Sequence, residues 1–261
     1  MGLQNFFKFR EIPDTESAKP FVEHLEDLRW TVVKMAITIF VAMILCFLFR
    51  GALTTMMQRP LDAVGQDIRT LQSLSITDSL TISFSLAFYA GIVISFPILL
   101  YFLAEFVLPA LTLVEKKLLL PAIGASFALF IIGVLGCYYW LLPTTIGFFL
   151  RDAQSLGWMP AWTVREYYSF VTRFTIAFGV AFELPILVLV LVRFGVLTFA
   201  VMQRTRPFAI VIIFVSSALI TPPDPLTMIA MGLPVYLLYE SCIWIAWFMQ
   251  RKKARADALE K

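Results

Sequence analysis

The chain has little charge and almost no histidine. Of its 261 residues, 15% are charged and 60% are hydrophobic, and His24 is its single histidine. This composition leaves far too little polar surface for a soluble globular protein. One histidine, placed ahead of the first long apolar run, cannot supply a membrane hydrolase with metal ligands or with a buried base for its nucleophile. We therefore expect a polytopic membrane protein that is not an enzyme.

Other functional signatures are missing as well. Cys46, Cys137 and Cys242 show neither disulfide nor metal-ligand spacing, so no metal site is expected. No Gly-x-x-x-x-Gly-Lys segment occurs, which excludes a P-loop for ATP, and no cofactor is expected. The net charge of +3 suggests no nucleic-acid partner. Residues 1–20 mix charges with Pro13 and lack the apolar core of a secretory signal, so we interpret them as a cytoplasmic tail.

Long apolar runs, in contrast, are abundant. Six of them qualify as membrane spans, and each must be helical because backbone groups in lipid bond internally. The runs lie at about Trp30–Phe49, Ser79–Ala104, Leu118–Leu150, Tyr167–Val192, Pro207–Ile220 and Leu226–Met249. The expected fold is an all-α, single domain over 1–261, with a six-helix membrane bundle at about 30–249 and a basic tail at 250–261. Prolines within the runs favour a concave, glove-like bundle.

The distribution of Lys and Arg orients this bundle. Fifteen of the 21 Lys and Arg residues lie on the side of the two termini and six on the other, so both termini are expected in the cytoplasm. The run Pro207–Ile220 would reach only about 21 Å against a hydrocarbon core of about 30 Å. We expect the last two spans to thin the bilayer, or else to lie inside a protein complex.

Glu183 is the one charged residue between Arg173 and Arg193. A lone acid near the centre of a span costs about 2.5–3.5 kcal/mol on insertion scales, which favours a functional role facing the bundle interior or a wet cavity. A packing role is the alternative, in which a buried carboxyl hydrogen-bonds to a neighbouring helix. The sequence leaves both open.

Several motifs together resemble the TatC family, the multispanning receptor subunits of the twin-arginine protein translocase. They are His-Leu-Glu-Asp-Leu-Arg at 24–29, Pro-x-x-x-Tyr with Phe-x-x-Pro-x-Leu-x-x-x-Glu-Lys at 97–116, Phe-Gly-Val-Ala-Phe-Glu-Leu-Pro at 178–185, Arg-Pro at 206–207 and Thr-Pro-Pro-Asp at 221–224. The resemblance implies a bacterial plasma-membrane receptor for the Arg-Arg signal peptides of folded proteins. It also implies export driven by the proton-motive force, in a hetero-oligomeric complex with TatA- and TatB-type single-span partners.

The resemblance assigns roles to individual residues. A guanidinium offers a planar fork to a carboxylate, so a receptor for two arginines needs at least two acids near the membrane surface. Glu115 matches the first acid of the family, and Glu26 or Asp27 would supply the second. The candidate signal-peptide residues are Glu26, Asp27, Arg29, Glu105, Phe106, Pro109, Leu111 and Glu115. Glu183 matches the family's intramembrane acid, and the residues assigned to partner contacts or structure are Pro60, Tyr167, Thr221, Asp224 and Met228.

The chain also departs from the family pattern. Phe102 and Ala104 stand where many relatives carry Gln and Trp, and Glu105 is an additional acid beside them, which we expect to share or alter arginine recognition. Asp27 is one methylene shorter than the more common Glu. We further expect Trp162, Tyr167 and Tyr168 to be aromatic anchors at the outer interface.

Two alternative functions fit the same residues. A secondary transporter would use Glu183 as a proton or ion site. A scaffolding subunit would use its acids for packing alone and would bind no signal peptide.

Overall fold

The structure, a computed structural model, describes residues 21–110, 113–193, 195, 197–220 and 225–259. Within these ranges, the side chains of residues 21–24, 110, 113–120, 220 and 252–259 are outside the description. The predicted tail at 1–20 and the candidate residues Leu111, Thr221 and Asp224 lie outside the described residues.

The described part of the chain is built from helices, in agreement with the predicted fold class. The α-helices are α1 (Phe21–Leu48), α2 (Arg50–Asp62), α3 (Asp78–Val107), α4 (Leu113–Gly136), α5 (Leu142–Ser155), α6 (Val164–Ala181), α7 (Leu184–Arg193), α8 (Phe199–Ile220) and α9 (Pro225–Leu259). Among the described residues, six helical segments are long and apolar enough to cross a membrane. The predicted number of spans is therefore confirmed.

The first two spans keep close to their predicted positions. α3 contains the whole run Ser79–Ala104. α1 begins at Phe21 rather than at Trp30, because residues 21–29 carry no glycine or proline and continue the helix of the span. Residues 21–29 are thus the first part of α1.

The third and fourth spans are helices with interruptions. A π turn, η4 (Cys137–Leu141), joins α4 to α5 in one continuous helical path. α6 and α7 are separated at Phe182 and Glu183. Pro185, in the first turn of α7, has no N–H and cannot continue the hydrogen-bond pattern of α6, which explains the break.

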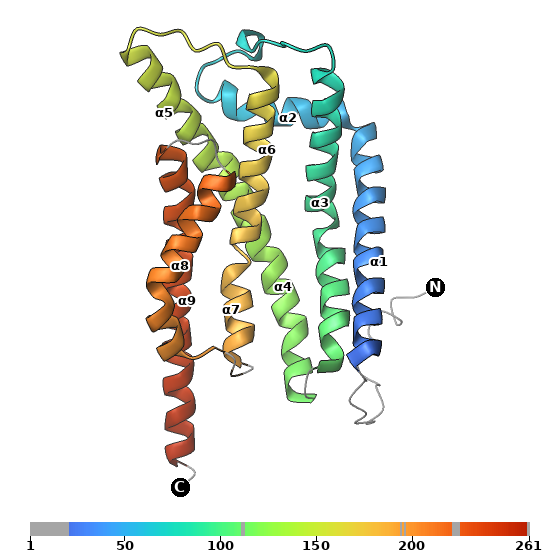
Figure 1. The fold of residues 1–261 in the computed structure, drawn as a ribbon, viewed down its shortest axis with the longest axis vertical. Helices are drawn as coiled ribbons and strands as arrows, with labels where there is room; N and C mark the ends of the chain where they lie inside the picture. The colour runs from blue at the N-terminus through green and yellow to red at the C-terminus, as the bar shows by residue number, and fades with distance from the viewer. Residues whose placement is uncertain (1–20, 111–112, 194, 196, 221–224, 260–261) are drawn as a thin grey trace.

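The fifth span is longer than its uncharged stretch. α8 begins at Phe199 rather than at Pro207 and has 22 residues, which is about 33 Å of helix. Arg204 and Arg206 are therefore helical, and Pro207 lies inside the helix. Figure 1 shows that the upper ends of α8 and α9 stop short of those of α3 and α6.

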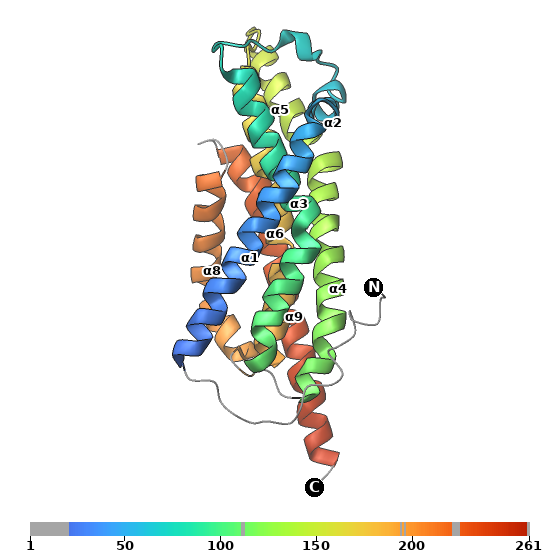
Figure 2. The same cartoon turned by 90° about the vertical axis from the view of Figure 1, so that its right-hand side faces the viewer.

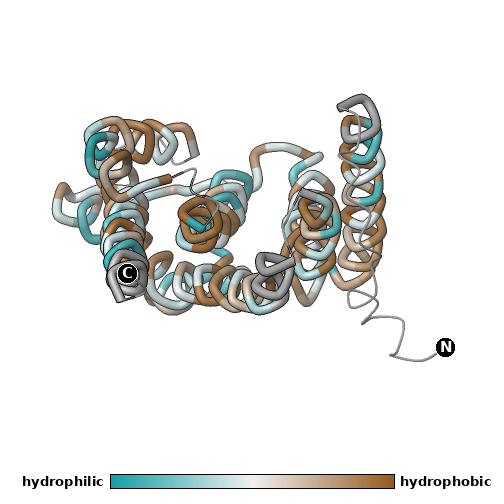
Figure 3. The backbone as a smooth tube through the Cα atoms, turned by 90° about the horizontal axis from the view of Figure 1, so that it is seen from below, coloured by the Kyte–Doolittle hydropathy of each residue, from teal (hydrophilic) through white to brown (hydrophobic). Residues whose placement is uncertain are grey.

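The helices form an open arrangement with two arms (Figures 1 to 3). α1 packs along α3 in one arm, α8 packs along α9 in the other, and α4, α6 and α7 connect them. We call the end where α1 begins and α9 ends the lower end, as in Figure 1, and the opposite end the upper end. Both ends of the described chain lie at the lower end, as an even number of spans requires.

The main core lies in the upper half of the molecule, beneath α2. Its buried residues include Leu61 of α2, Leu142 of α5 and Phe174 of α6. Large apolar side chains elsewhere are exposed, such as Phe40 on α1 and Ile212 on α8, which are 60% and 64% exposed. Exposed apolar faces on both arms are expected for helices that face lipid.

Candidate functional site

Three helices bring their acidic segments to the lower end. The start of α1 carries Glu26, Asp27 and Arg29, the last turn of α3 carries Glu105, and Glu115 is the third residue of α4 (Figure 1). Glu26 and Arg29 are exposed and Asp27 is half-buried. The side chain of Glu115 is outside the description. The helix ends that carry the predicted acids thus lie at the same end of the molecule, with α3 between α1 and α4.

Apolar residues accompany these acids. Phe106 is half-buried near the end of α3, and Pro109 is exposed in the 3-10 turn η3 (Leu108–Ala110) that follows. Both belong to the connection between α3 and α4, so the lower end offers apolar contacts beside its charges.

Lys34 is a cation of this region that sequence reasoning missed. Its Nζ lies 3.6 Å from Oε2 of Glu105, and 5.7 Å from the centroid of the Phe102 ring. The pair links α1 to α3. A signal was present in the sequence, since Lys34 follows Asp27 by seven residues and therefore shares its helical face.

Glu183 lies at the break between α6 and α7 and reaches α4. The hydroxyl of Ser126 donates a hydrogen bond to Oε2 of Glu183. Among the described residues, Oε1 of Glu183 is buried and has no hydrogen-bond partner. The packing role considered for Glu183 requires a hydrogen bond to a neighbouring helix, and this is such a bond. The sequence did not identify Ser126 as its donor.

α4 and α6 approach closely next to this contact. A Cβ added to Gly179 would lie 2.8 Å from atoms of Phe130 and Val134, and one added to Gly133 would lie 2.8 Å from Phe182. Glycine at both positions lets the helices meet and allows Ser126 to reach the break.

α2 is held from below by the hydroxyls of Tyr138, Tyr167 and Tyr168. Tyr138 donates to the carbonyl of Met56, and Tyr167 donates to that of Met57 at 2.8 Å. Pro60 has no N–H, so the Met56 carbonyl, four residues earlier, lacks its helical donor. Tyr138 supplies the missing donor. Pro60 itself is buried inside α2.

The expectation of tyrosine anchors at the outer interface is corrected by this arrangement. Tyr167 and Tyr168 are 5% and 4% exposed and lie in the core beneath α2. Their hydroxyls find protein partners there, since the amide of Gln58 donates to the hydroxyl of Tyr168 at 3.0 Å. Trp162 is half-buried and packs against the same core.

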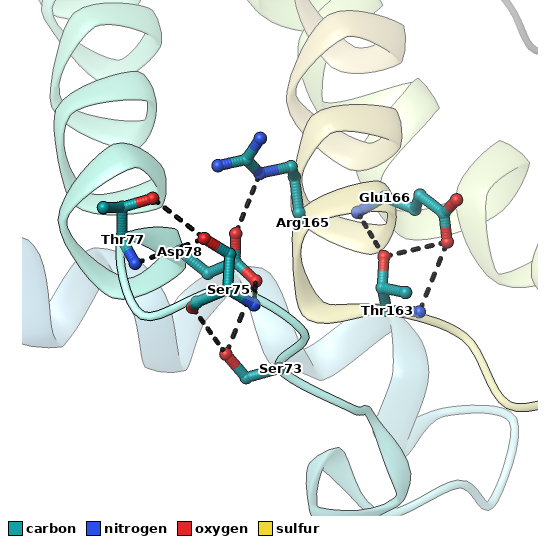
Figure 4. Close-up of polar contacts among 7 residues, drawn as sticks. All are labelled: Ser73, Ser75, Thr77, Asp78, Thr163, Arg165 and Glu166. Atoms are coloured by element: carbon teal, nitrogen blue, oxygen red, sulfur yellow. Dashed lines mark hydrogen bonds and ion pairs between the residues drawn. The ribbon is translucent and has the colours of Figure 1, made fainter.

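The loops at the upper end are tied together by polar contacts (Figure 4). The Nε of Arg165 lies 2.9 Å from Oδ1 of Asp78, whose Oδ2 accepts a hydrogen bond from the backbone N–H of Ser75 at 3.0 Å. Thr163 and Glu166 form a capping box that begins α6. These contacts fix the starts of α3 and α6 relative to each other.

The second arm has an ion pair of its own. Nη2 of Arg206 in α8 lies 2.7 Å from Oε1 of Glu240 in α9. Met228 is half-buried in the first turn of α9, beside the fully buried Thr227. Among the described residues, no group of three or more His, Cys, Asp or Glu could hold a metal ion.

Comparison with known proteins gives consistent matches. The family model for Sec-independent protein translocase protein (TatC) matches residues 23–234. The TatC protein of Akkermansia muciniphila is 43% identical over 195 residues, which cover 74% of this chain and 56% of that relative. The chain thus spans little more than half the length of that relative. The TatC protein of Magnetococcus marinus is 31% identical over 250 residues, which cover 95% of this chain and 91% of the relative.

A solved structure matches the fold as well. The crystal structure of a twin arginine translocase receptor, TatC, superimposes with a TM-score of 0.79 and 33% sequence identity, covering 86% of this chain and 98% of that chain. The motifs at 24–29 and 97–116 and the break at Glu183 fall within the residues that the family model matches. The chain therefore belongs to the TatC family of Sec-independent protein translocase proteins, and it is a multi-pass membrane component of a translocase rather than an enzyme.

Proposed function

We propose that this protein is the receptor and core subunit of a twin-arginine translocation system, which binds the Arg-Arg signal peptides of folded proteins. One observation carries the proposal: acidic segments of α1, α3 and α4 lie at the lower end of the molecule, as does the half-buried Phe106. Glu115 and either Asp27 or Glu26 accept the two arginines of the signal, and Arg29 belongs to the same surface.

The chemistry of arginine supports two acids in this place. A carboxylate accepts a guanidinium through two parallel hydrogen bonds, which an ammonium group cannot form. An exposed ion pair contributes only about 0–1 kcal/mol, so charges alone give weak binding. Phe106, Pro109 and Leu111 add an apolar contact for the hydrophobic part of the signal peptide.

The lower end faces the cytoplasm in this proposal, and the protein lies in the bacterial plasma membrane with both termini inside. The excess of Lys and Arg on the side of the termini supports this orientation. TatA- and TatB-type single-span proteins join the receptor in a hetero-oligomer that exports cargo with the proton-motive force. Family membership supports these partners, and the exposed apolar faces of the two arms offer them helix surfaces.

Glu183 has a second role in the proposal, as the polar group that meets an inserted signal in the membrane. Its free Oε1 and the nearby helix break support this role. A secondary transporter is less well supported, because Ser126 already occupies one of the two carboxylate oxygens on which that function would depend.

Peptide binding tests the receptor proposal. We would measure the affinity of a fluorescent Arg-Arg signal peptide and of its Lys-Lys version for the protein in nanodiscs. We expect a preference for Arg-Arg that Glu115→Gln removes and the charge-preserving Glu115→Asp partly retains. Equal affinities for both peptides, or equal binding by the two variants, would point to a scaffolding subunit.

A further inference from the structure

Lys34 and Glu105 form an ion pair between α1 and α3 at the lower end. Lys34 Nζ lies 3.6 Å from Glu105 Oε2, and the two side chains are 46% and 48% exposed. The ammonium group also lies 5.7 Å from the centroid of the Phe102 ring. A carboxylate at the edge of the proposed signal site is thus already in contact with a cation of the protein itself.

We propose that Lys34 sets the affinity of this site by competing with the signal peptide for Glu105. In the empty receptor it occupies Glu105, and an arginine of the signal peptide must displace it to reach the carboxylate. The inference rests on the proposed receptor function, which it deepens by adding Glu105 as a further arginine acceptor.

An incoming side chain gains free energy only if its contact with Glu105 is better than the contact that Lys34 already makes. An ammonium group meets a carboxylate as a point charge, whereas a guanidinium forms two parallel hydrogen bonds. An arginine that replaces Lys34 therefore gains a better contact. A lysine that replaces Lys34 exchanges one ammonium contact for another and gains nothing. Releasing Lys34 costs both peptides the same free energy, so the pair weakens the binding of both and leaves the preference for arginine to the contact that the guanidinium makes.

Displacement is feasible because the pair is loose. Its single contact is long at 3.6 Å, and water competes with it at side chains that are about half exposed. Phe102 lies within cation–π range of the ammonium and continues to attract Lys34 once Glu105 has been taken. The exchange moves side chains and leaves the packing of α1 on α3 unchanged.

Binding of the Arg-Arg and Lys-Lys peptides to Lys34 and Glu105 variants in nanodiscs tests the inference. Lys34→Gln frees Glu105, so we expect the dissociation constants of both peptides to fall about two- to fivefold and their ratio to stay the same. Lys34→Arg holds Glu105 more firmly and should weaken the binding of both. Glu105→Gln should weaken Arg-Arg binding and make a further Lys34→Gln change silent.

The outcomes separate the inference from the receptor proposal. A wild-type protein without a preference for Arg-Arg overturns the receptor function, and the role of Lys34 with it. A wild-type preference for Arg-Arg, with dissociation constants that Lys34→Gln leaves unchanged, overturns the role of Lys34 alone. If the pair only ties α1 to α3, Lys34→Gln lowers the melting temperature, Lys34→Arg does not, and both dissociation constants stay at their wild-type values. Arg50→Gln removes one positive charge at the start of α2, far from the lower end, and an equal effect there would assign the result to net charge.

Discussion

The hydroxyl of Tyr138 donates a hydrogen bond to the carbonyl of Met56, the carbonyl that Pro60 leaves without a helical donor. This contact explains how a proline is accommodated inside α2. We predict that Tyr138→Phe lowers the free energy of unfolding by about 1–3 kcal/mol, because a buried acceptor loses its donor. Thermal unfolding of the purified protein in detergent would measure the loss.

Two further variants test this explanation. Pro60→Ala restores an N–H at position 60, so the double variant Pro60→Ala/Tyr138→Phe should lose less stability than Tyr138→Phe alone. Tyr139→Phe is the control, since Tyr139 is 64% exposed and should tolerate the change. If the losses in the free energy of unfolding from Pro60→Ala and Tyr138→Phe add in the double variant, the Tyr138 hydroxyl does not replace the N–H that Pro60 lacks.

Glycine at position 179 sets the distance between α6 and α4. Gly179→Ala would place a Cβ 2.8 Å from atoms of Phe130 and Val134, and we predict a loss of about 1–3 kcal/mol in the free energy of unfolding. Gly124→Ala is the matched control, because nothing lies within 4 Å of a Cβ there. It should be neutral or gain up to about 1 kcal/mol from higher helix propensity. If Gly179→Ala and Gly124→Ala melt at the same temperature, the close approach of α4 and α6 does not require glycine at position 179.

Asp78 holds the upper loops together through Arg165 and Ser75. Its side chain is 4% exposed, whereas that of Arg165 is 52% exposed. We predict that Asp78→Ala lowers the melting temperature more than Arg165→Gln does, because it removes the acceptor for the Ser75 N–H as well as the ion pair. Limited proteolysis of the loop at residues 63–77 should accelerate in the same order. The opposite order would mean that the arginine makes the more important contacts.

Arg206 and Glu240 depend on each other in the second arm. Their side chains are 36% and 24% exposed, so either charge alone would remain partly desolvated within a span. We predict that Arg206→Gln and Glu240→Gln each cost about 1–3 kcal/mol, less than fully buried pairs do. The exchanged pair Arg206→Glu/Glu240→Arg should recover most of the loss in the same unfolding assay. If the exchanged pair loses as much stability as Arg206→Glu and Glu240→Arg lose in sum, the position of each charge determines the stability and the pairing does not.

Hydropathy was sufficient to predict the spans, because lipid imposes long apolar helices regardless of tertiary packing. α3 and the continuous path through α4 and α5 follow from it directly. The boundaries of α1 and α8 could not be obtained in this way. Both helices extend through charged residues, Glu26 in α1 and Arg206 in α8. The helical conformation of such residues depends on local helix propensity and, for Arg206, on its partner Glu240.

The contacts between helices were the least predictable. α2 is not apolar enough to be recognised as a membrane element, and the buried position of Tyr167 depends on α2 lying above it. The bond from Ser126 to Glu183 joins residues far apart in the sequence, and the pairing of Lys34 with Glu105 requires the register of α1 on α3. The acids near Glu115 could be named from the sequence because the family motifs contain them, and their role in signal binding stays a prediction.

The π turn at Cys137–Leu141 also affects which changes in chain length the fold tolerates. An α-helix rotates by about 100° per residue, so the wider turn accommodates an extra residue and keeps the faces of α4 and α5 in phase. Leu142, Ile146 and Leu150 all remain buried as a result. Deleting one residue from the turn would restore a regular helix with the faces of α4 and α5 still in phase, whereas a deletion elsewhere in either helix would rotate these side chains out of the core. In the third span, a single-codon deletion should therefore be tolerated best at the π turn.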